Sequence, residues 1–110
     1  MSNDDFIPKK ERDHNTSDKE SIPIEEVFSS RGRVKIIRVL AKRNELNISE
    51  IARQANLNHS TACQHLEFLE HAGVIQKKVF GRIKIYRFRL ENVRAKAIKH
   101  LFEIWEDTSQ

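Results

Sequence analysis

Few residues of the kinds that build disulfides, phosphate loops or membrane spans are present. The chain has one cysteine, three glycines and two prolines in 110 residues. Cys63 has no partner for an intrachain disulfide and no Cys-x-x-Cys pattern occurs, which favours a reducing environment. No apolar run approaches the ~18 residues that cross a bilayer, and no signal-peptide pattern begins the chain, so we expect a cytoplasmic protein with no membrane partner.

Catalytic patterns are equally scarce. None of the three glycines lies in a Gly-rich loop that could hold a nucleotide phosphate. No nucleophile has an evident neighbouring base, and no paired carboxylates mark a pocket. We therefore predict that the chain is not an enzyme and needs no cofactor.

Positive charge is concentrated in one part of the chain. Residues 1–26 carry four basic and eight acidic residues, whereas the remainder carries sixteen basic and only eight acidic ones. Such a surplus attracts a polyanion such as DNA or RNA, although it also serves solubility alone. The first segment, residues 1–20, has only Phe6 and Ile7 as bulky apolar side chains. We interpret it as a disordered polar tail and residues 21–110 as one domain.

Two helices are predicted at the start of this domain. Pro23 suits the first turn of a short helix that ends near Phe28. Ser29 or Ser30 can cap a second helix that reaches about Arg43. Its apolar residues lie opposite a basic stripe, which we interpret as a solvated face: Arg31, Lys35, Arg38 and Lys42.

The stretch 47–75 predicts a helix-turn-helix. Ser49 is a candidate N-cap for a helix of about two turns, with Ile51, Ala52 and Ala55 facing inward. Asn56 can end that helix in the left-handed conformation, and Asn58 can cap the next one. On this second helix Ala62, Leu66 and Leu69 form an apolar stripe, and Gly73 ends it. Two helices joined by a short turn place the polar start of the second where a major groove could receive it.

A cationic β-hairpin is expected next. Residues 74–80 and 83–90 are rich in strand formers, and Gly81-Arg82 favours a type II′ turn between them. Like charges across a hairpin repel, so its positive charge is better explained by contact with phosphates or a minor groove than by stability. A solvated edge protected by lysine and arginine is the alternative. The cations are Lys77, Lys78, Arg82, Lys84, Arg87 and Arg89.

This order of elements resembles the ArsR-type winged-helix repressors over about residues 24–106. The resemblance implies an α+β, mainly helical fold: a winged helix-turn-helix with a two-stranded wing and a C-terminal dimerisation helix. It also implies a homodimeric repressor that reads a palindromic operator in double-stranded DNA. The most specific matches are Ile51-Ala52, Leu57, Ser60-Thr61, His65-Leu66, Leu69, Ala72-Gly73-Val74-Ile75 and Tyr86-Arg87.

The metal sites found in ArsR-type sensors are incomplete in this sequence. Residues 50–53 hold no cysteine, where many relatives have a Cys-x-Cys pair. His100 and Glu103 resemble one acid and histidine pair, but residues 91–93 offer no histidine to complete the other. A structural zinc ion needs about four ligands, so we expect no metal.

Candidate DNA contacts follow from side-chain chemistry and from the resemblance. Gln64 can make two hydrogen bonds to adenine, although many relatives have arginine there. His59 stands in the turn that resembles the family's base-reading positions. Arg82 at the tip of the wing suits a narrow minor groove. The predicted DNA-binding set is His59, Ser60, Thr61, Cys63, Gln64, Lys77, Arg82 and Lys84.

The C-terminal helix, expected over residues 91–105, has two apolar strips. A small domain can bury one strip, so the other implies a partner, most simply the same helix of a second copy. A larger monomeric core is the alternative. The predicted dimer interface is Ile24, Val27, Phe28, Ile98, Leu101, Phe102 and Trp105.

Three functions remain open from sequence. The first is a sequence-specific transcriptional regulator. The second is an architectural protein that coats DNA with little base readout, and the third is a winged-helix docking module of the transcription machinery. The operator, the direction of regulation and any effector or redox signal at Cys63 are not encoded in a recognisable pattern.

Overall fold

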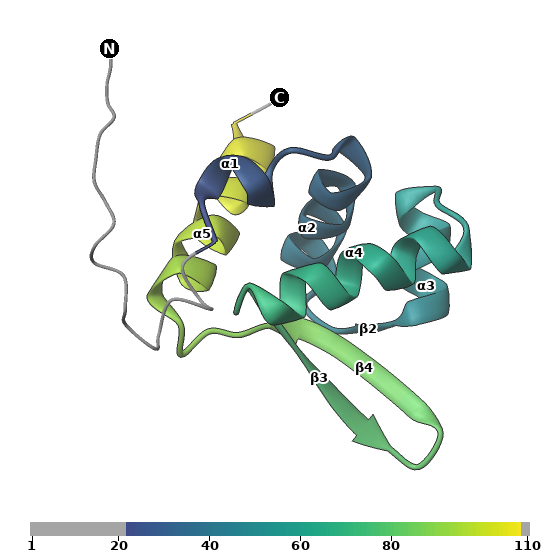
Figure 1. Cartoon of the computed structure of the whole chain (residues 1–110). Helices are drawn as coiled ribbons and strands as arrows, with labels where there is room; N and C mark the ends of the chain where they lie inside the picture. The colour runs from purple at the N-terminus through teal and green to yellow at the C-terminus, as the bar shows by residue number, and fades with distance from the viewer. Residues whose placement is uncertain (1–21, 109–110) are drawn as a thin grey trace, which may run out of the picture.

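The computed structural model describes residues 22–108, as a mainly helical α+β domain with a protruding hairpin (Figure 1). The tail predicted over residues 1–20 lies outside the described residues. The winged helix-turn-helix fold is confirmed. In chain order the elements are α1 (Ile24–Val27), α2 (Arg31–Arg43), β2 (Leu46–Asn47), α3 (Ile48–Ala55), α4 (His59–His71), β3 (Ile75–Phe80), β4 (Ile83–Phe88) and α5 (Val93–Asp107).

The core forms where α2 meets α3, α4 and α5. Helix α2 begins as expected, because the Ser30 side chain accepts a hydrogen bond from the backbone N–H of Arg33 at 3.2 Å. Its inward face carries three aliphatic side chains with no exposed surface, Ile36, Ile37 and Leu40. Helix α4 contributes Leu66 and Leu69 to the same core. The helical periodicity of apolar residues therefore predicted the buried faces of both helices.

The turn between α3 and α4 has the geometry that asparagine permits. Asn56 has φ 58° and ψ 50°, the left-handed conformation, and its backbone N–H bonds the Arg53 carbonyl oxygen. The Asn58 side chain then accepts from the Thr61 backbone N–H at 2.8 Å. Both predictions for this turn are confirmed.

The wing is part of a three-stranded antiparallel sheet with the order β2-β4-β3. The short strand β2 pairs with β4 through Leu46 and Tyr86. At the hairpin tip Gly81 has φ +62°, whereas Arg82 is not among the residues with positive φ. This combination fits the expected type II′ turn and excludes type I′, which needs positive φ at both positions.

Two helix starts differ from the sequence-based prediction. Helix α3 is capped by Asn47, whose side chain accepts from the Glu50 N–H at 2.9 Å, and not by Ser49. Helix α5 begins at Val93 rather than residue 91, because the Asn92 side chain caps it by accepting from the Arg94 N–H. Asparagine is as good an N-cap as serine, so residue preference alone did not separate the alternatives.

Candidate nucleic-acid interface

The first turns of α4 present polar side chains to solvent. His59, Ser60 and Gln64 are exposed, whereas Thr61 and Cys63 are half-buried. On the opposite side of the helix Ala62 and Leu66 have no exposed surface. Burial of one face orients the other outward, so the predicted recognition residues are available to a macromolecule.

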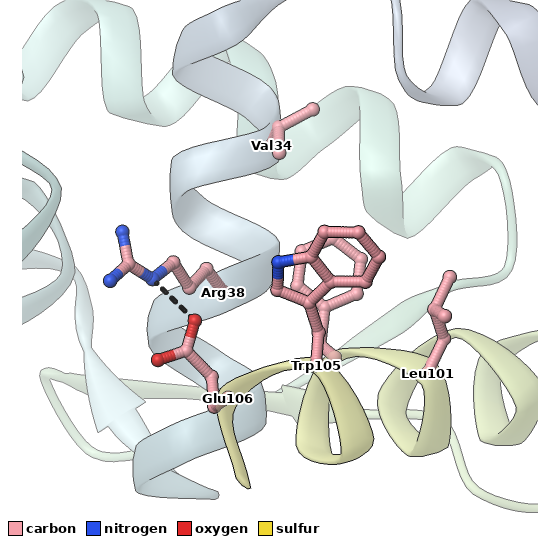
Figure 2. Close-up of a pocket in the computed structure, with 6 residues that line it drawn as sticks. Val34, Arg38, Leu101, Trp105 and Glu106 are labelled. Carbon is pink, nitrogen blue, oxygen red and sulfur yellow. Dashed lines mark ion pairs between the residues drawn. The ribbon is translucent and has the colours of Figure 1, made fainter. Parts of the chain in front are cut away.

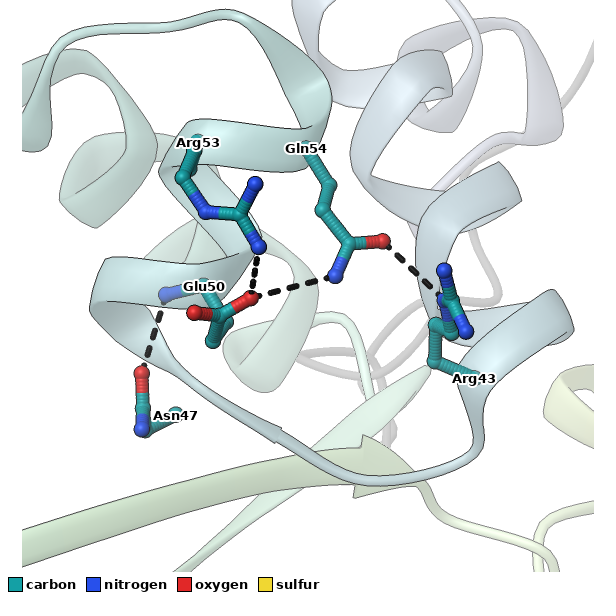
Figure 3. Close-up of polar contacts among 5 residues, drawn as sticks. All are labelled: Arg43, Asn47, Glu50, Arg53 and Gln54. Carbon is teal, nitrogen blue, oxygen red and sulfur yellow. Dashed lines mark hydrogen bonds and ion pairs between the residues drawn. The ribbon is translucent and has the colours of Figure 1, made fainter.

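A polar network fixes the neighbouring helix α3 (Figure 3). Its cap, Asn47, holds the first turn. The Glu50 carboxylate accepts from Arg53 at 2.5 Å and from the Gln54 amide at 3.2 Å. The Gln54 oxygen in turn accepts from Arg43 Nε at 3.2 Å, which ties α3 to the end of α2. These bonds to the charged form lower the pKa of Glu50, the Arg53 bond most strongly.

His65 anchors α4 to the start of α2. Its Nε2 lies 3.3 Å from Ser30 Oγ. A Cβ added to Gly32 would lie 3.0 Å from that same nitrogen, so the two helices approach closely at this point. The Arg33 guanidinium stacks 3.7 Å from the Phe68 ring centroid on α4 and donates to the Glu26 carbonyl at 2.6 Å. Burial, followed by the charge of Arg33, lowers the pKa of His65.

We expect this histidine to make stability depend on pH. Because the folded pKa of His65 lies below its unfolded value of about 6.5, the unfolded chain takes up the proton first as pH falls. The stability that this pKa difference contributes to the free energy of unfolding is therefore fully present above about pH 7 and is lost as pH falls through about 6. Urea midpoints between about pH 8 and pH 6 should fall for the natural chain and fall less for His65→Gln. An identical pH dependence in both proteins would contradict this assignment.

The wing divides its cations into two groups. Arg87 pairs with Glu45 at 2.9 Å, and Arg89 pairs with Glu91 at 3.1 Å. The other four cations make no ion pair with any residue in the range 22–108: Lys77, Lys78, Arg82 and Lys84. Sequence alone did not distinguish the six cations. In the fold, those available to a partner lie mainly toward the hairpin tip.

A hollow of about 430 Å³ lies between α4 and the wing. It is lined by His59 and Cys63 from α4 and by Lys77, Arg82 and Lys84 from the wing. Five of the eight predicted DNA-binding residues therefore line one surface. Ser60, Thr61 and Gln64 do not line the hollow, and they project from the same two turns of α4.

Two carboxylates also line this hollow, and neither belongs to the predicted DNA-binding set. Glu67 and Glu70 line the hollow from α4, together with the three wing cations. Tyr86 lines the hollow as well, and burial, followed by the charge of Glu70, raises its pKa. Cys63 Sγ lies 3.7 Å from His59 Nδ1, one helical turn away.

Helix α5 has an exposed apolar strip beside α2 (Figure 2). Leu101 is 49% exposed and Trp105 is 69% exposed, and both line an open hollow of about 520 Å³ with Val34. An ion pair between Arg38 and Glu106, at 3.0 Å, borders it. Ile104 is also exposed, although it was not in the predicted interface. Exposed apolar side chains that gather on one strip make it a candidate association site.

The predicted dimer interface needs one correction. Val27 is only 5% exposed and belongs to the protomer's own core, so it offers almost no surface to a partner. Phe28, Ile98 and Phe102 are half-buried and pack against that core, with the Phe28 and Phe102 rings stacked at 6.2 Å. Ile24 stays exposed with Leu101 and Trp105. The inner strip of α5 is therefore Ala95, Ile98 and Phe102, and Trp105 belongs to the outer one.

The described residues offer neither a cluster of metal ligands nor a helix that could span a membrane. Within residues 22–108, no three side chains of histidine, cysteine, aspartate or glutamate gather where they could hold a metal ion. None of the described helices combines the length and the apolar character needed to cross a bilayer.

Comparisons with known proteins find similarity to regulatory proteins. The family described as "Bacterial regulatory protein, arsR family" matches residues 30–77. No curated protein matches the chain. Similar solved structures include HlyU from Vibrio cholerae (20% identity, 86% of this chain and 98% of that chain covered, TM-score 0.67) and the transcriptional repressor PagR of Bacillus anthracis (25%, 77% and 94%, 0.63). A homodimeric winged helix-turn-helix DNA-binding domain from Mycobacterium bovis is also similar (20%, 93% and 91%, 0.66).

Proposed function

Residues 30–77 carry the helix-turn-helix of the arsR family of bacterial regulatory proteins, and on this premise we propose a homodimeric repressor that reads a palindromic operator. The resemblance stated from the sequence is confirmed by this match. The matched family consists of regulators, as expected for a chain that is not an enzyme.

One observation carries the proposal most directly. His59 and Cys63 from the start of α4 and the wing cations Lys77, Arg82 and Lys84 line one hollow, and the exposed Ser60 and Gln64 project from the same turns of α4. Base edges are read by short polar side chains in a major groove, and phosphates are held by lysine and arginine beside it. Solubility alone would not require the polar side chains of α4 and the cations of the wing to lie on the same surface.

Each predicted contact has a role that its chemistry allows. Gln64 offers a donor and an acceptor to adenine N7 and N6, and His59, Ser60 and Thr61 lie on the same end of α4 for base edges or phosphates. Lys77 and Lys84 hold the backbone, while Arg82 reaches the minor groove. Cys63, beside His59, packs against the approaching backbone.

A twofold dimer would present two such surfaces. The occupant of the apolar strip on α5 is, in this proposal, the same strip of a second copy, with Leu101 and Trp105 at its centre and Ile24 at its edge. The similar Mycobacterium bovis domain is a homodimer, which supports this arrangement. Two recognition helices about one turn of DNA apart predict a palindromic site.

Selection of bound sequences from a random DNA pool tests the function. A regulator enriches one palindromic sequence and retains its preference for that site as salt is raised. An architectural protein shows a steep salt dependence without enrichment, and a docking module shows neither. Either of the last two results would overturn the proposal.

Gln64→Ala is expected to relax the base preference at one position of each half-site. Loss of a bidentate contact should reduce discrimination there by about 1–3 kcal/mol while non-specific affinity changes little. Competition between the selected site and single-base variants measures this difference. His71→Ala serves as a control, because His71 is exposed at the far end of α4. Equal discrimination by Gln64→Ala and the natural chain would remove Gln64 from the readout.

A further inference from the structure

The tip of the wing carries exposed apolar side chains, although the residues that flank it in the sequence are cationic. Phe80 is 62% exposed and Ile83 is 55% exposed. They are direct cross-strand partners on either side of the turn, so their side chains leave the same face of the hairpin. The turn residue Gly81 has nothing within 4 Å of the position that a Cβ would occupy. The hairpin therefore ends in a narrow, protruding apolar edge.

The charge around this apolar edge indicates which class of partner it fits. Residues 74–90 contain no acidic side chain, and the cations Lys78, Arg82 and Lys84 lie within two residues of Phe80 or Ile83. An apolar edge surrounded only by positive charge suits a partner with apolar surface between two lines of negative charge. The minor groove of DNA has this arrangement, since sugars and base edges lie between its phosphate strands.

The position of the tip agrees with that partner. Ile83 and Arg82 line the same hollow as His59, in the first turn of α4. When the start of α4 occupies a major groove, a wing on that side of the helix meets the adjacent backbone and minor groove. Cross-strand packing alone would explain a contact between Phe80 and Ile83, but it does not require either ring or branched chain to remain more than half exposed.

We propose that Phe80 and Ile83 form an apolar wedge that enters the minor groove beside each half-site and bends the DNA there. This inference rests on the proposed function and adds a second means of recognition to it. Apolar side chains that enter a minor groove partly unstack a base step and kink the duplex toward the major groove. The cost is lowest at flexible pyrimidine–purine steps, so these steps would be preferred under the wing even without a hydrogen bond.

The test compares the double variant Phe80→Thr and Ile83→Thr with the single variant Val79→Thr. Threonine is β-branched and favours a strand, so the hairpin is retained. Val79 is a matched control because it is 56% exposed and pairs with Lys84 on the opposite face of the same hairpin. Thermal unfolding of each variant verifies that the domain stays folded.

Bending is measured as energy transfer between dyes at the two ends of a duplex that contains the selected site. We expect the natural chain and Val79→Thr to raise the transfer, and the double variant to lose most of that rise with about tenfold weaker binding. Unchanged transfer and affinity in the double variant would overturn the wedge while leaving the regulator intact. The wedge would also be overturned if the double variant binds more weakly but the natural chain does not bend the DNA. Failure of the natural chain to select any site would instead refute the proposed function.

Discussion

Trp105→Lys is expected to convert the proposed dimer into monomers and to weaken binding to the full operator by about 100-fold or more. Trp105 is 69% exposed and stands on the outer strip of α5, next to Leu101. A buried tryptophan at the centre of an interface typically carries about 2–4 kcal/mol, and a lysine there would add an unpaired charge. Sedimentation measures the association, and titration of operator DNA measures the loss.

The choice of lysine separates association from electrostatics. The substitution adds positive charge, which by itself would strengthen contact with DNA. His100→Lys adds the same charge at an exposed position on the same helix, outside the apolar strip, and should leave the dimer intact. A natural chain that sediments as a monomer at micromolar concentration would contradict the twofold model. A Trp105→Lys protein that stays dimeric would remove Trp105 from the interface.

Removing three wing cations together should have the other large effect. With Lys77, Arg82 and Lys84 all replaced by glutamine, we expect about 10²–10³-fold weaker binding at about 0.1 M salt. Each phosphate contact contributes about 0.9 to the slope of log affinity against log salt, so the slope should become shallower by about 2.7. These three side chains make no ion pair within the described part of the chain, so their loss should leave folding unaffected.

A triple variant on α2 provides the matched control. Arg31→Gln, Lys35→Gln and Lys42→Gln remove the same charge from the basic stripe of α2, which we interpret as a solvated face. That protein should lose far less affinity, and its salt slope should stay close to that of the natural chain. Equal losses in the two triple variants would mean that net charge, rather than the wing, attracts DNA.

Local chemistry explains which parts of the fold could be predicted. The cap at Ser30, the left-handed Asn56, the cap at Asn58 and the turn at Gly81 depend on residues within a few positions of each other. The buried faces of α2 and α4 follow from helical periodicity. The error at the start of α3 has the same origin, because Asn47 and Ser49 are both good caps and only the backbone path selects one.

The candidate site was predicted less completely, because contacts between distant residues decide it. Arg87 forms an ion pair with Glu45, which lies 42 positions away in the sequence, so this cation of the wing is neutralised. Val27 enters the protomer core, whereas Ile104 joins the exposed strip of α5. The apolar tip was present in the sequence as strand-forming residues, but their exposure is a tertiary property.

The sequence by itself determined the order of elements, the turn and caps of the helix-turn-helix, and the segment that carries the positive charge. Each depends on interactions between near neighbours in the chain or on composition. Only the tertiary structure decided which wing cations form ion pairs, which strip of α5 is exposed, and that α4 and the wing line one hollow. These properties arise when distant segments pack together, and the distance between two residues in the sequence does not determine their distance in space.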